Sequence, residues 1–327
     1  MERRRSLACP TAVMASLATC MLAGIASLAQ SASAGDEVAS LDDLIASFGW
    51  DLATAEIKSQ KLGKGLYVLF GIGGNIGVSI GPSGTLIVDD QFPELMPKIE
   101  AAIRKLGGRS VDFAINTHWH FDHAEGNLAL GPAGTWIVSQ ANSRDRMASG
   151  SLINLTMTKY RQQAYPPDAL PVISFDDHMS FHFNGERIDL IHPGPAHTTG
   201  DTAVLFRGHN AVHMGDVFNN TGYPFIDADS GGEIDGMIAF CESVLAELKP
   251  GAIVIPGHGA VTDYAALQRY IGMLKTVRDR VSRMIERGMS LAEVEAARPT
   301  ADWDATFGDV ANSLGFVDRV YTSLKKK

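Results

Sequence analysis

A run of eight residues, Asn116-Thr-His-Trp-His-Phe-Asp-His123, constrains this chain most strongly. It holds three histidines and an aspartate in H-x-H-x-D-H spacing, and both residue types bind metal ions. The run follows Val111–Ile115, a short apolar stretch that predicts a buried strand. The histidines would then lie at the carboxyl end of that strand, where layered α/β folds bind ligands. A single histidine could lie on a surface loop by chance. Three histidines and an aspartate at this spacing instead predict a metal site, for zinc or, less strictly, for iron or manganese.

The first 34 residues have the pattern of a secretory signal peptide. Arg3-Arg4-Arg5 is a basic n-region, Leu7–Leu28 is apolar and free of charge, and Ala32-Ser33-Ala34 fits a small-x-small cleavage site. The apolar stretch is long enough for a membrane anchor, but its small residues and the cleavage site favour export and removal. We therefore expect a periplasmic or secreted protein with no stable membrane span, and the arginines leave general and twin-arginine export both open.

Composition limits the partners of the remaining chain, residues 35–327, which is long enough for one large domain. The formal net charge is −9, and the part after the predicted signal peptide is more acidic still because three arginines leave with that peptide. Such a protein is a poor general binder of nucleic acid, which disfavours a nuclease. Cys9 and Cys20 lie in the signal peptide, so Cys241 has no intrachain partner, and we expect it to be buried and inert.

Hydrophobic periodicity predicts strands and helices in alternation. The expected strands are 66–70, 75–80, 85–88, 111–115, 135–138, 179–183, 186–191, 203–206, 211–214 and 252–255, and the expected helices are 94–106, 141–147, 234–248, 263–287, 291–298 and 310–324. Gly71–Gly74 is expected to close a hairpin, because a second strand and not a helix follows it. Residues 41–61 should form an amphipathic cover at an edge. Residues 149–171 have weak periodicity and should form an irregular surface excursion able to act as a lid.

Three more residues of metal-binding type follow expected strands in the same way: His197, Asp216 and His258. With the first four they form a set able to hold two metal ions. Over roughly Leu66–His258 the chain resembles the metallo-β-lactamase-fold hydrolase superfamily. The segments that carry this resemblance occur in family order and are Thr117-His-Trp-His-Phe-Asp-His123, Ala196-His-Thr-Thr-Gly-Asp201, Met214-Gly-Asp-Val-Phe218 and Pro256-Gly-His-Gly259.

This resemblance implies an α/β fold, a four-layer αββα sandwich of two mixed sheets between helices. The helices expected after it from periodicity form a helical tail over about 262–327. The resemblance also implies two zinc ions, the first held by His118, His120 and His197, and the second held by Asp122, His123 and His258, with Asp216 as the bridge. Secreted β-lactamases of the superfamily have cysteine or serine in place of Asp216, whereas glyoxalase II-like and lactonase-like members have aspartate. A di-iron redox branch has glutamate in place of His120, so the histidine favours zinc hydrolysis.

The resemblance implies hydrolysis of a small cyclic amide or ester, of the β-lactam or lactone class. Two zinc ions about 3.5–4 Å apart lower the pKa of a shared water, and the hydroxide formed attacks the carbonyl carbon. Asp122 is expected to act as a catalytic residue that binds metal and orients this nucleophile. No G-x-S-x-G motif points to a serine hydrolase instead.

Residues around the expected centre are assigned less sharply. Thr117, Thr198, Thr199 and Asp201 are expected either to fix imidazole tautomers or to cap loops. The expected substrate contacts are Phe70, Trp119, Asn219 and Tyr223, with core packing as the alternative for Trp119. The remaining histidines are expected to be structural or at the surface, and they are His178, His182, His192, His209 and His213.

Three other functions remain open from the sequence. A thioesterase of the glyoxalase II type would share the bridging aspartate, but glutathione thioesters are mainly cytosolic and the chain has an export signal. An iron-dependent sulfur dioxygenase would keep similar histidines. A non-catalytic metal-binding protein would keep the ligands alone, because a shared fold does not establish activity. The sequence does not indicate an oligomeric state.

Overall fold

The computed structural model describes residues 38–308 and 310–326, and these residues belong to one compact unit. The expected signal peptide, residues 1–34, lies outside the described residues. Among the described residues, no helix combines the length and the apolar character needed to cross a membrane. Periplasmic or secreted localisation stays a prediction.

A first large sheet has seven strands in the order β10-β7-β6-β5-β4-β3-β2. Its strands are β2 (Lys58–Gly63), β3 (Leu66–Phe70), β4 (Ile76–Gly81), β5 (Gly84–Val88), β6 (Phe113–Ile115), β7 (Trp136–Gln140) and β10 (Ile173–Phe175). The pairs from β2 to β5 are antiparallel, and those from β5 through β6 and β7 to β10 are parallel. Residues Gly71–Gly74 join β3 to β4, which confirms the predicted hairpin.

A second sheet has six strands in the order β11-β12-β13-β14-β15-β16. Its strands are β11 (His178–Phe183), β12 (Glu186–Ile191), β13 (Ala203–Phe206), β14 (Ala211–His213), β15 (Ile253–Ile255) and β16 (Thr262–Asp263). The β14–β15 pair is parallel and the others are antiparallel. Asn184 and Gly185 both have positive φ, at 50° and 83°, as the two-residue turn between β11 and β12 requires.

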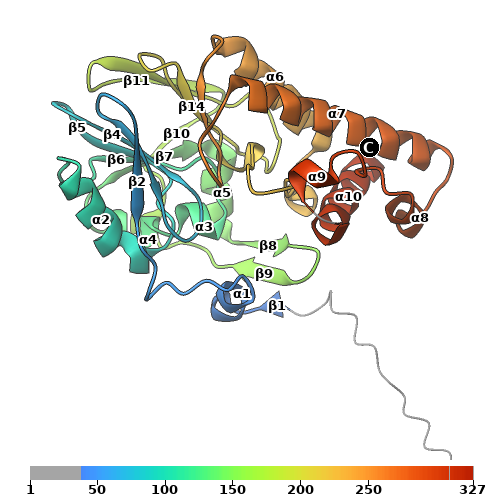
Figure 1. Cartoon of the computed structure of the whole chain (residues 1–327). Helices are drawn as coiled ribbons and strands as arrows, with labels where there is room; N and C mark the ends of the chain where they lie inside the picture. The colour runs from blue at the N-terminus through green and yellow to red at the C-terminus, as the bar shows by residue number, and fades with distance from the viewer. Residues whose placement is uncertain (1–37, 309, 327) are drawn as a thin grey trace, which may run out of the picture. The chain divides into compact units, whose positions relative to one another are not determined.

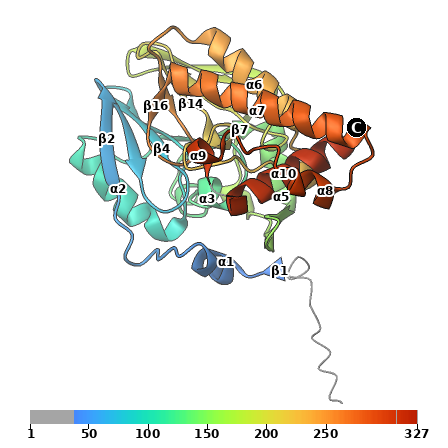
Figure 2. The same cartoon turned by 45° about the vertical axis from the view of Figure 1, so that its right-hand side comes forward.

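Helices cover the outer face of each sheet. The helices of the first half are α1 (Leu41–Ser47), which precedes the first sheet, and α2 (Met96–Lys105), α3 (Phe121–Ala124), α4 (Asn127–Leu130) and α5 (Ala141–Ser149), which follow its strands. Those in the second half are α6 (Ile234–Glu247), α7 (Tyr264–Glu286), α8 (Leu291–Ala296), α9 (Asp304–Phe307) and α10 (Val310–Lys325). Short 3₁₀ turns are η1 (Pro93–Leu95), η2 (Pro167–Ala169), η3 (Gly215–Val217) and η4 (Ala228–Ser230). Figure 1 shows α2 on one side of the sheets and α6 and α7 on the other, and the rotated view in Figure 2 keeps this order.

Three apolar cores hold these layers together. The central core joins side chains of both sheets, such as Val88 of β5 and Val204 of β13. An outer core joins α2 to the first sheet, and another joins α6, α7 and α10 to the second. Cys241 of α6 is wholly buried in the latter, as predicted, and burial raises the pKa of its thiol. The predicted αββα sandwich is therefore confirmed, together with its C-terminal helices.

Two segments differ from their predicted form. Residues 149–171 are not irregular, because β8 (Ser151–Asn154) and β9 (Lys159–Gln162) form a hairpin, and β9 pairs in parallel with β1 (Val38–Ala39). Each strand has only four residues, too few for a clear alternating pattern. Residues 41–61 contain not one amphipathic cover but α1 and the first part of the edge strand β2.

Candidate metal centre

The loops after four strands bring the predicted metal-binding side chains together. After β6 the chain carries His118 and His120 on an irregular stretch, and Asp122 and His123 on the short helix α3. The other side chains follow β12, β14 and β15, and they are His197, Asp216 and His258. The ligand atoms form three overlapping groups, within each of which all atoms lie within 4.8 Å of one another. These groups are His118/His120/His197, His118/His123/Asp216 and Asp122/His123/His258.

Asp216 lies between the two halves of this cluster. Its Oδ1 is 3.1 Å from His123 Nε2, and its Oδ2 is 3.4 Å from His258 Nε2 and 3.9 Å from His197 Nε2. One carboxylate is therefore within reach of ligand atoms from both triads. This is the position that a bridging ligand would occupy between two ions.

Two of the imidazoles are oriented by one buried carboxylate, Asp89, which directly follows β5. Asp89 Oδ2 accepts hydrogen bonds from His123 Nδ1 at 2.7 Å and from the Thr117 hydroxyl at 2.8 Å. The Thr117 oxygen then accepts from His118 Nδ1 at 3.1 Å, because its only proton is already donated. This network assigns the proton of each ring to Nδ1 and leaves Nε2 of both with a free lone pair toward the cluster.

His120 and His197 are held by separate acceptors. His197 Nδ1 donates to the Phe225 carbonyl at 2.8 Å, so its Nε2 faces the cluster. His120 has the opposite orientation, because its Nε2 donates to the buried Asp227 at 3.2 Å and its Nδ1 lies 2.9 Å from His197 Nε2. The four rings thus each present one unprotonated nitrogen to the same space.

The donor set fits metal ions. His118 Nε2 is buried with no hydrogen-bond partner, and His123 Nε2 and His258 Nε2 point at each other across 3.1 Å. Convergent imidazole lone pairs and carboxylates are the ligands that zinc binds, and unpaired buried nitrogens are costly unless a cation satisfies them. The side chains of Asp122, Asp216 and His258 are 11%, 16% and 21% exposed, so the centre opens to solvent on this side.

Burial and neighbouring charges shift the pKa values of the metal-binding residues in opposite directions. Burial lowers the pKa of His118 well below its usual value, and the nearby rings of His123 and His197 lower it further. Burial also disfavours the charged form of His258, but the carboxylates of Asp216 and Asp122 outweigh it and raise the pKa of His258 to about 10. Without a metal ion, protons on the rings of His123 and His258 take the place of its charge, and these positive rings outweigh burial and hold the pKa of Asp216 well below its usual value. Asp216 is therefore ionised.

Glycines let the backbone pass close to these side chains. A Cβ on Gly74, in the β3–β4 hairpin, would lie 2.2 Å from His123 Cε1. A Cβ on Gly257 would lie 1.9 Å from Asp216 Oδ1 and 2.8 Å from the Asp216 backbone nitrogen. The hairpin is fastened to the site by Gly74 N, which donates to the Asp122 carbonyl at 2.9 Å.

The fold agrees with comparisons against known proteins. A family model described as Metallo-beta-lactamase superfamily matches residues 77–258, more than half of the chain. The chain belongs to the metallo-beta-lactamase superfamily. A solved metallo-beta-lactamase from Pontibacter korlensis is 15% identical, with a TM-score of 0.57 over 67% of this chain and 99% of that one. DIM-1 metallo-beta-lactamase is 18% identical, with a TM-score of 0.54 over 68% of this chain and 98% of that one. The protein is thus a metal-dependent hydrolase by family and fold.

Of the four predicted substrate contacts, burial contradicts one, Trp119, and the other three stay predictions. Trp119 is wholly buried in the core of the first sheet, as its core-packing alternative expected, and so cannot contact a substrate. Tyr223 is 8% exposed and donates its hydroxyl to Asp304 at 2.8 Å, and Asn219 Oδ1 accepts from Thr221 N at 2.8 Å within its own turn. These bonds hold both side chains in place, and Tyr223 also lines a groove described below. Phe70 is half-buried at the end of β3.

The other predicted polar residues either orient an imidazole or close a loop. Thr117 orients an imidazole, as described above. Thr198 and Asp201 instead close the His197 loop, because Thr198 Oγ1 donates to Asp201 Oδ1 at 2.9 Å, and Thr199 accepts from Asn142 through its backbone carbonyl. The remaining histidines are structural or exposed. His213 Nε2 bonds Asn75 O, His192 Nδ1 bonds Asp201 O, His209 Nδ1 bonds Glu186, and His178 and His182 are exposed.

Asp89, Asp227 and the Phe225 carbonyl are the functional groups that the sequence did not single out. Asp89 had a usable signal, because like Asp216 it is an aspartate that follows a predicted strand. It also has a left-handed backbone, with φ of 65°, which is uncommon outside glycine. Asp227 and Phe225 lie in an irregular segment with no such mark.

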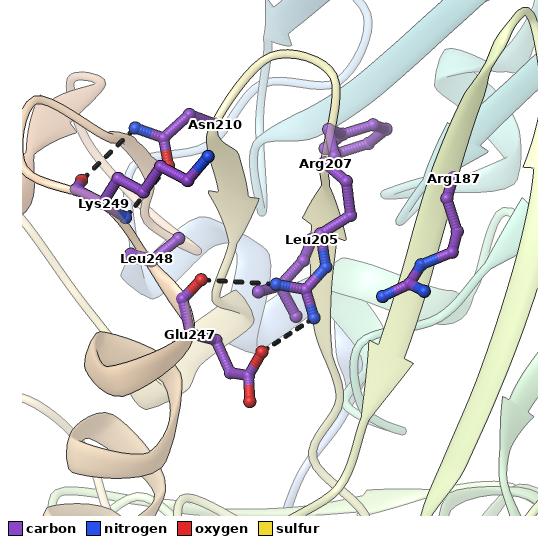
Figure 3. A pocket seen from close by; sticks show the side chains of 8 residues that line it. Arg187, Leu205, Arg207, Asn210, Glu247, Leu248 and Lys249 are labelled. Carbon is purple, nitrogen blue, oxygen red and sulfur yellow. Dashed lines mark hydrogen bonds and ion pairs between the residues drawn. The ribbon is translucent and has the colours of Figure 1, made fainter.

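A separate cavity of about 300 Å³ lies at the amino end of β14, whereas Asp216 follows the carboxyl end of that strand. Figure 3 shows Arg207 bonded to Glu247 in this cavity, and their charged atoms lie 2.9 Å apart. Arg207 also pairs with the buried Asp189 at 2.6 Å, and Arg187 pairs with Asp189 at 2.7 Å. The arginine charges are thus neutralised, and the cavity takes no part in the metal centre.

Proposed function

We propose that this protein is an exported hydrolase with two zinc ions that opens cyclic esters or amides, of the lactone or β-lactam class. The observation that supports it best is the position of Asp216, whose carboxylate oxygens lie within 3.9 Å of ligand nitrogens from both triads. In the proposal His118, His120 and His197 hold the first ion, and Asp122, His123 and His258 hold the second. Such a pair of ions lowers the pKa of a bound water toward neutrality and polarises a carbonyl oxygen.

The chain's own groups would prepare this chemistry. The hydrogen bonds from Asp89, Asp227 and the Phe225 carbonyl keep the ligand nitrogens unprotonated and fixed in place. Asp122, on the solvent-open side, is placed to orient the attacking water as well as to bind the second ion. Water cleaves the single bond between the carbonyl carbon and the ring oxygen or nitrogen. The ring-opened product carries a new carboxylic acid and a new alcohol or amine.

The test is turnover of a chromogenic β-lactam, an aliphatic lactone and an aryl ester by zinc-loaded protein, with chelated protein as the control. We expect chelator-sensitive hydrolysis that returns when zinc is added back. Because Asp216 stands where secreted β-lactamases have cysteine or serine, we expect the ester and lactone to be better substrates than the β-lactam. Metal analysis of the purified protein decides against the iron dioxygenase alternative if zinc predominates. Zinc-loaded protein with no turnover on any of the three would contradict the proposal.

A further inference from the structure

A groove lies beside the metal centre, between the tip of the β8–β9 hairpin and the C-terminal helix α10. It encloses about 480 Å³, a size suited to a small-molecule group. Its hairpin wall is Leu155–Met157, and its helix wall includes Leu314 and Phe316. Figure 1 shows the hairpin, in green, on the same side of the molecule as α10, in red. Because the family match ends at residue 258, this helix wall lies outside the family-matched residues.

Phe225 connects the groove to the metal centre. Its ring lines the groove and lies 5.8 Å from the ring of His197 and 6.2 Å from that of His120, measured between centroids. Its carbonyl accepts the hydrogen bond that orients His197. A group seated in the groove would therefore be one aromatic ring away from the metal ligands.

The groove walls are held in place before any ligand binds. Asp229 of η4 accepts from Asn154 Nδ2 of β8 at 2.8 Å and from Arg319 Nη1 of α10 at 2.8 Å, so one carboxylate fastens both walls. At the base, the rings of Tyr223 and Phe316 are stacked with centroids 5.4 Å apart. A preformed site loses less conformational entropy when it binds a ligand.

The lining is apolar with an acidic rim. Met157 is 84% exposed and Leu314 is 39% exposed, which leaves unusually large apolar surface open to water. The charged lining residues are Glu295 and Asp318, and no lysine, arginine or histidine is among the lining residues that the structure describes. Asp318 is paired with Arg319 Nε at 2.7 Å, so the negative charge of the rim comes mainly from Glu295. A ligand carboxylate would be repelled here, whereas a neutral apolar group would cover Met157 and Leu314.

We propose that this groove binds an uncharged apolar group of the substrate, an alkyl chain or aromatic ring attached to the carbonyl that is hydrolysed. This inference rests on the proposed hydrolase function and narrows its substrates to neutral esters or lactones with an apolar substituent. Charged acyl groups of the same length are poor substrates.

The test compares three esters on zinc-loaded protein: 4-nitrophenyl acetate, 4-nitrophenyl butyrate and mono-4-nitrophenyl succinate, whose acyl chain matches butyrate in length but ends in a carboxylate. We expect kcat/KM to rise about tenfold from acetate to butyrate, through KM, since each methylene in an apolar site contributes several-fold. The succinate should be at least about tenfold poorer than butyrate. Met157→Ala and Leu314→Ala should each lower the butyrate-to-acetate ratio about threefold, and Glu295→Gln should improve succinate relative to butyrate.

Val172→Ala is the matched control, because Val172 is 63% exposed but lies outside the groove, and it should leave the ratio unchanged. Equal kcat/KM for acetate and butyrate, or the same ratio in the groove variants as in the parent, would overturn the inference while hydrolysis itself stood. If no ester is hydrolysed, the proposed function fails for esters, and binding of the neutral dye Nile red to the same proteins tests the groove alone. Binding that weakens in the Met157→Ala/Leu314→Ala double variant supports the groove, and unchanged binding overturns it.

Discussion

Replacement of Asp89 by asparagine tests whether one buried carboxylate sets the proton positions of two metal-binding imidazoles. Asp89 is wholly buried and accepts three hydrogen bonds: from Thr117 N at 2.7 Å, from the Thr117 hydroxyl at 2.8 Å and from His123 Nδ1 at 2.7 Å. An amide of the same shape has only one acceptor oxygen, so its NH₂ group must face either the backbone N–H or the other two partners.

The favourable orientation points the NH₂ group of the new asparagine toward the Thr117 hydroxyl and His123 and leaves its oxygen facing the Thr117 backbone N–H. The backbone N–H of Thr117 cannot change its role, and leaving it unpaired would cost about 1–3 kcal/mol. The Thr117 hydroxyl can rotate and His123 can change tautomer, so both can accept from the amide instead. The rotated hydroxyl then donates to His118 Nδ1. Both changes move a ring proton to Nε2 of His118 and His123, toward the metal ions.

Asp89→Asn should therefore weaken zinc binding by about 10–100-fold, or about 1.4–2.7 kcal/mol, while it changes the stability of the metal-free protein little. The assay is zinc competition against a chromophoric chelator, with chemical unfolding of the metal-free protein alongside. Asp189→Asn is the matched control, because Asp189 is also wholly buried but pairs with Arg187 and Arg207 away from the centre. That variant should lose stability and keep its zinc affinity. Folded Asp89→Asn protein with zinc affinity within twofold of the parent would refute the reasoning.

Three further outcomes follow from the structure. Gly257→Ala should displace the Asp216 carboxylate, so the protein should lose one bound metal ion and most of its hydrolytic activity. Gly272→Ala in α7 has open space at its Cβ, so it should keep both metal ions and the activity and gain up to about 1 kcal/mol in stability. Equal metal content in the two variants would contradict this. Chelation should lower the melting temperature by about 5–10 °C, and added zinc should restore it, because zinc at 100 times its Kd stabilises the folded protein by about 2.7 kcal/mol. Calorimetric scans that are the same with and without chelator would show that the folded protein does not bind zinc. The pKa of Asp229 is lowered to about 2, since bonds from Arg319 and Lys326 outweigh burial, so its stabilisation is present above the unfolded pKa near 4 and is lost as pH falls toward 2. Asp229→Asn should cost about 1 kcal/mol at pH 7 after solvent screening, with a difference that shrinks below pH 4 in urea unfolding, and a cost independent of pH would count against the ion pairs.

Local patterns predicted the layers of this fold, while pairings between distant segments stayed hidden. The apolar runs of the two main sheets are strong enough to mark most strands, and the helix from Asp263 was marked by its cap, whose side chain accepts from Ala266 N at 2.8 Å. The four-residue strands β8 and β9 and the edge strand β2 carry too little alternation to be seen. Their place depends on neighbours such as β1 that lie more than 100 residues away or on a sheet edge.

The metal-binding side chains could be predicted from the sequence, because four of them lie within six residues and the other three follow predicted strands. The groups that orient them could not, because contact arises only in the folded chain. Asp89 is 34 positions from His123, and Asp227 is 107 positions from His120. Trp119 shows the opposite case. It lies between two metal-binding histidines in the sequence, but its ring packs in the core of the first sheet and is wholly buried.

Anomalous diffraction at the zinc edge from crystals of zinc-loaded protein tests the central claim most directly. The account predicts two peaks about 3.5–4 Å apart, one beside His118, His120 and His197 and the other beside Asp122, His123 and His258, with Asp216 in contact with both. A single peak within the cluster, or two peaks without Asp216 between them, would contradict it.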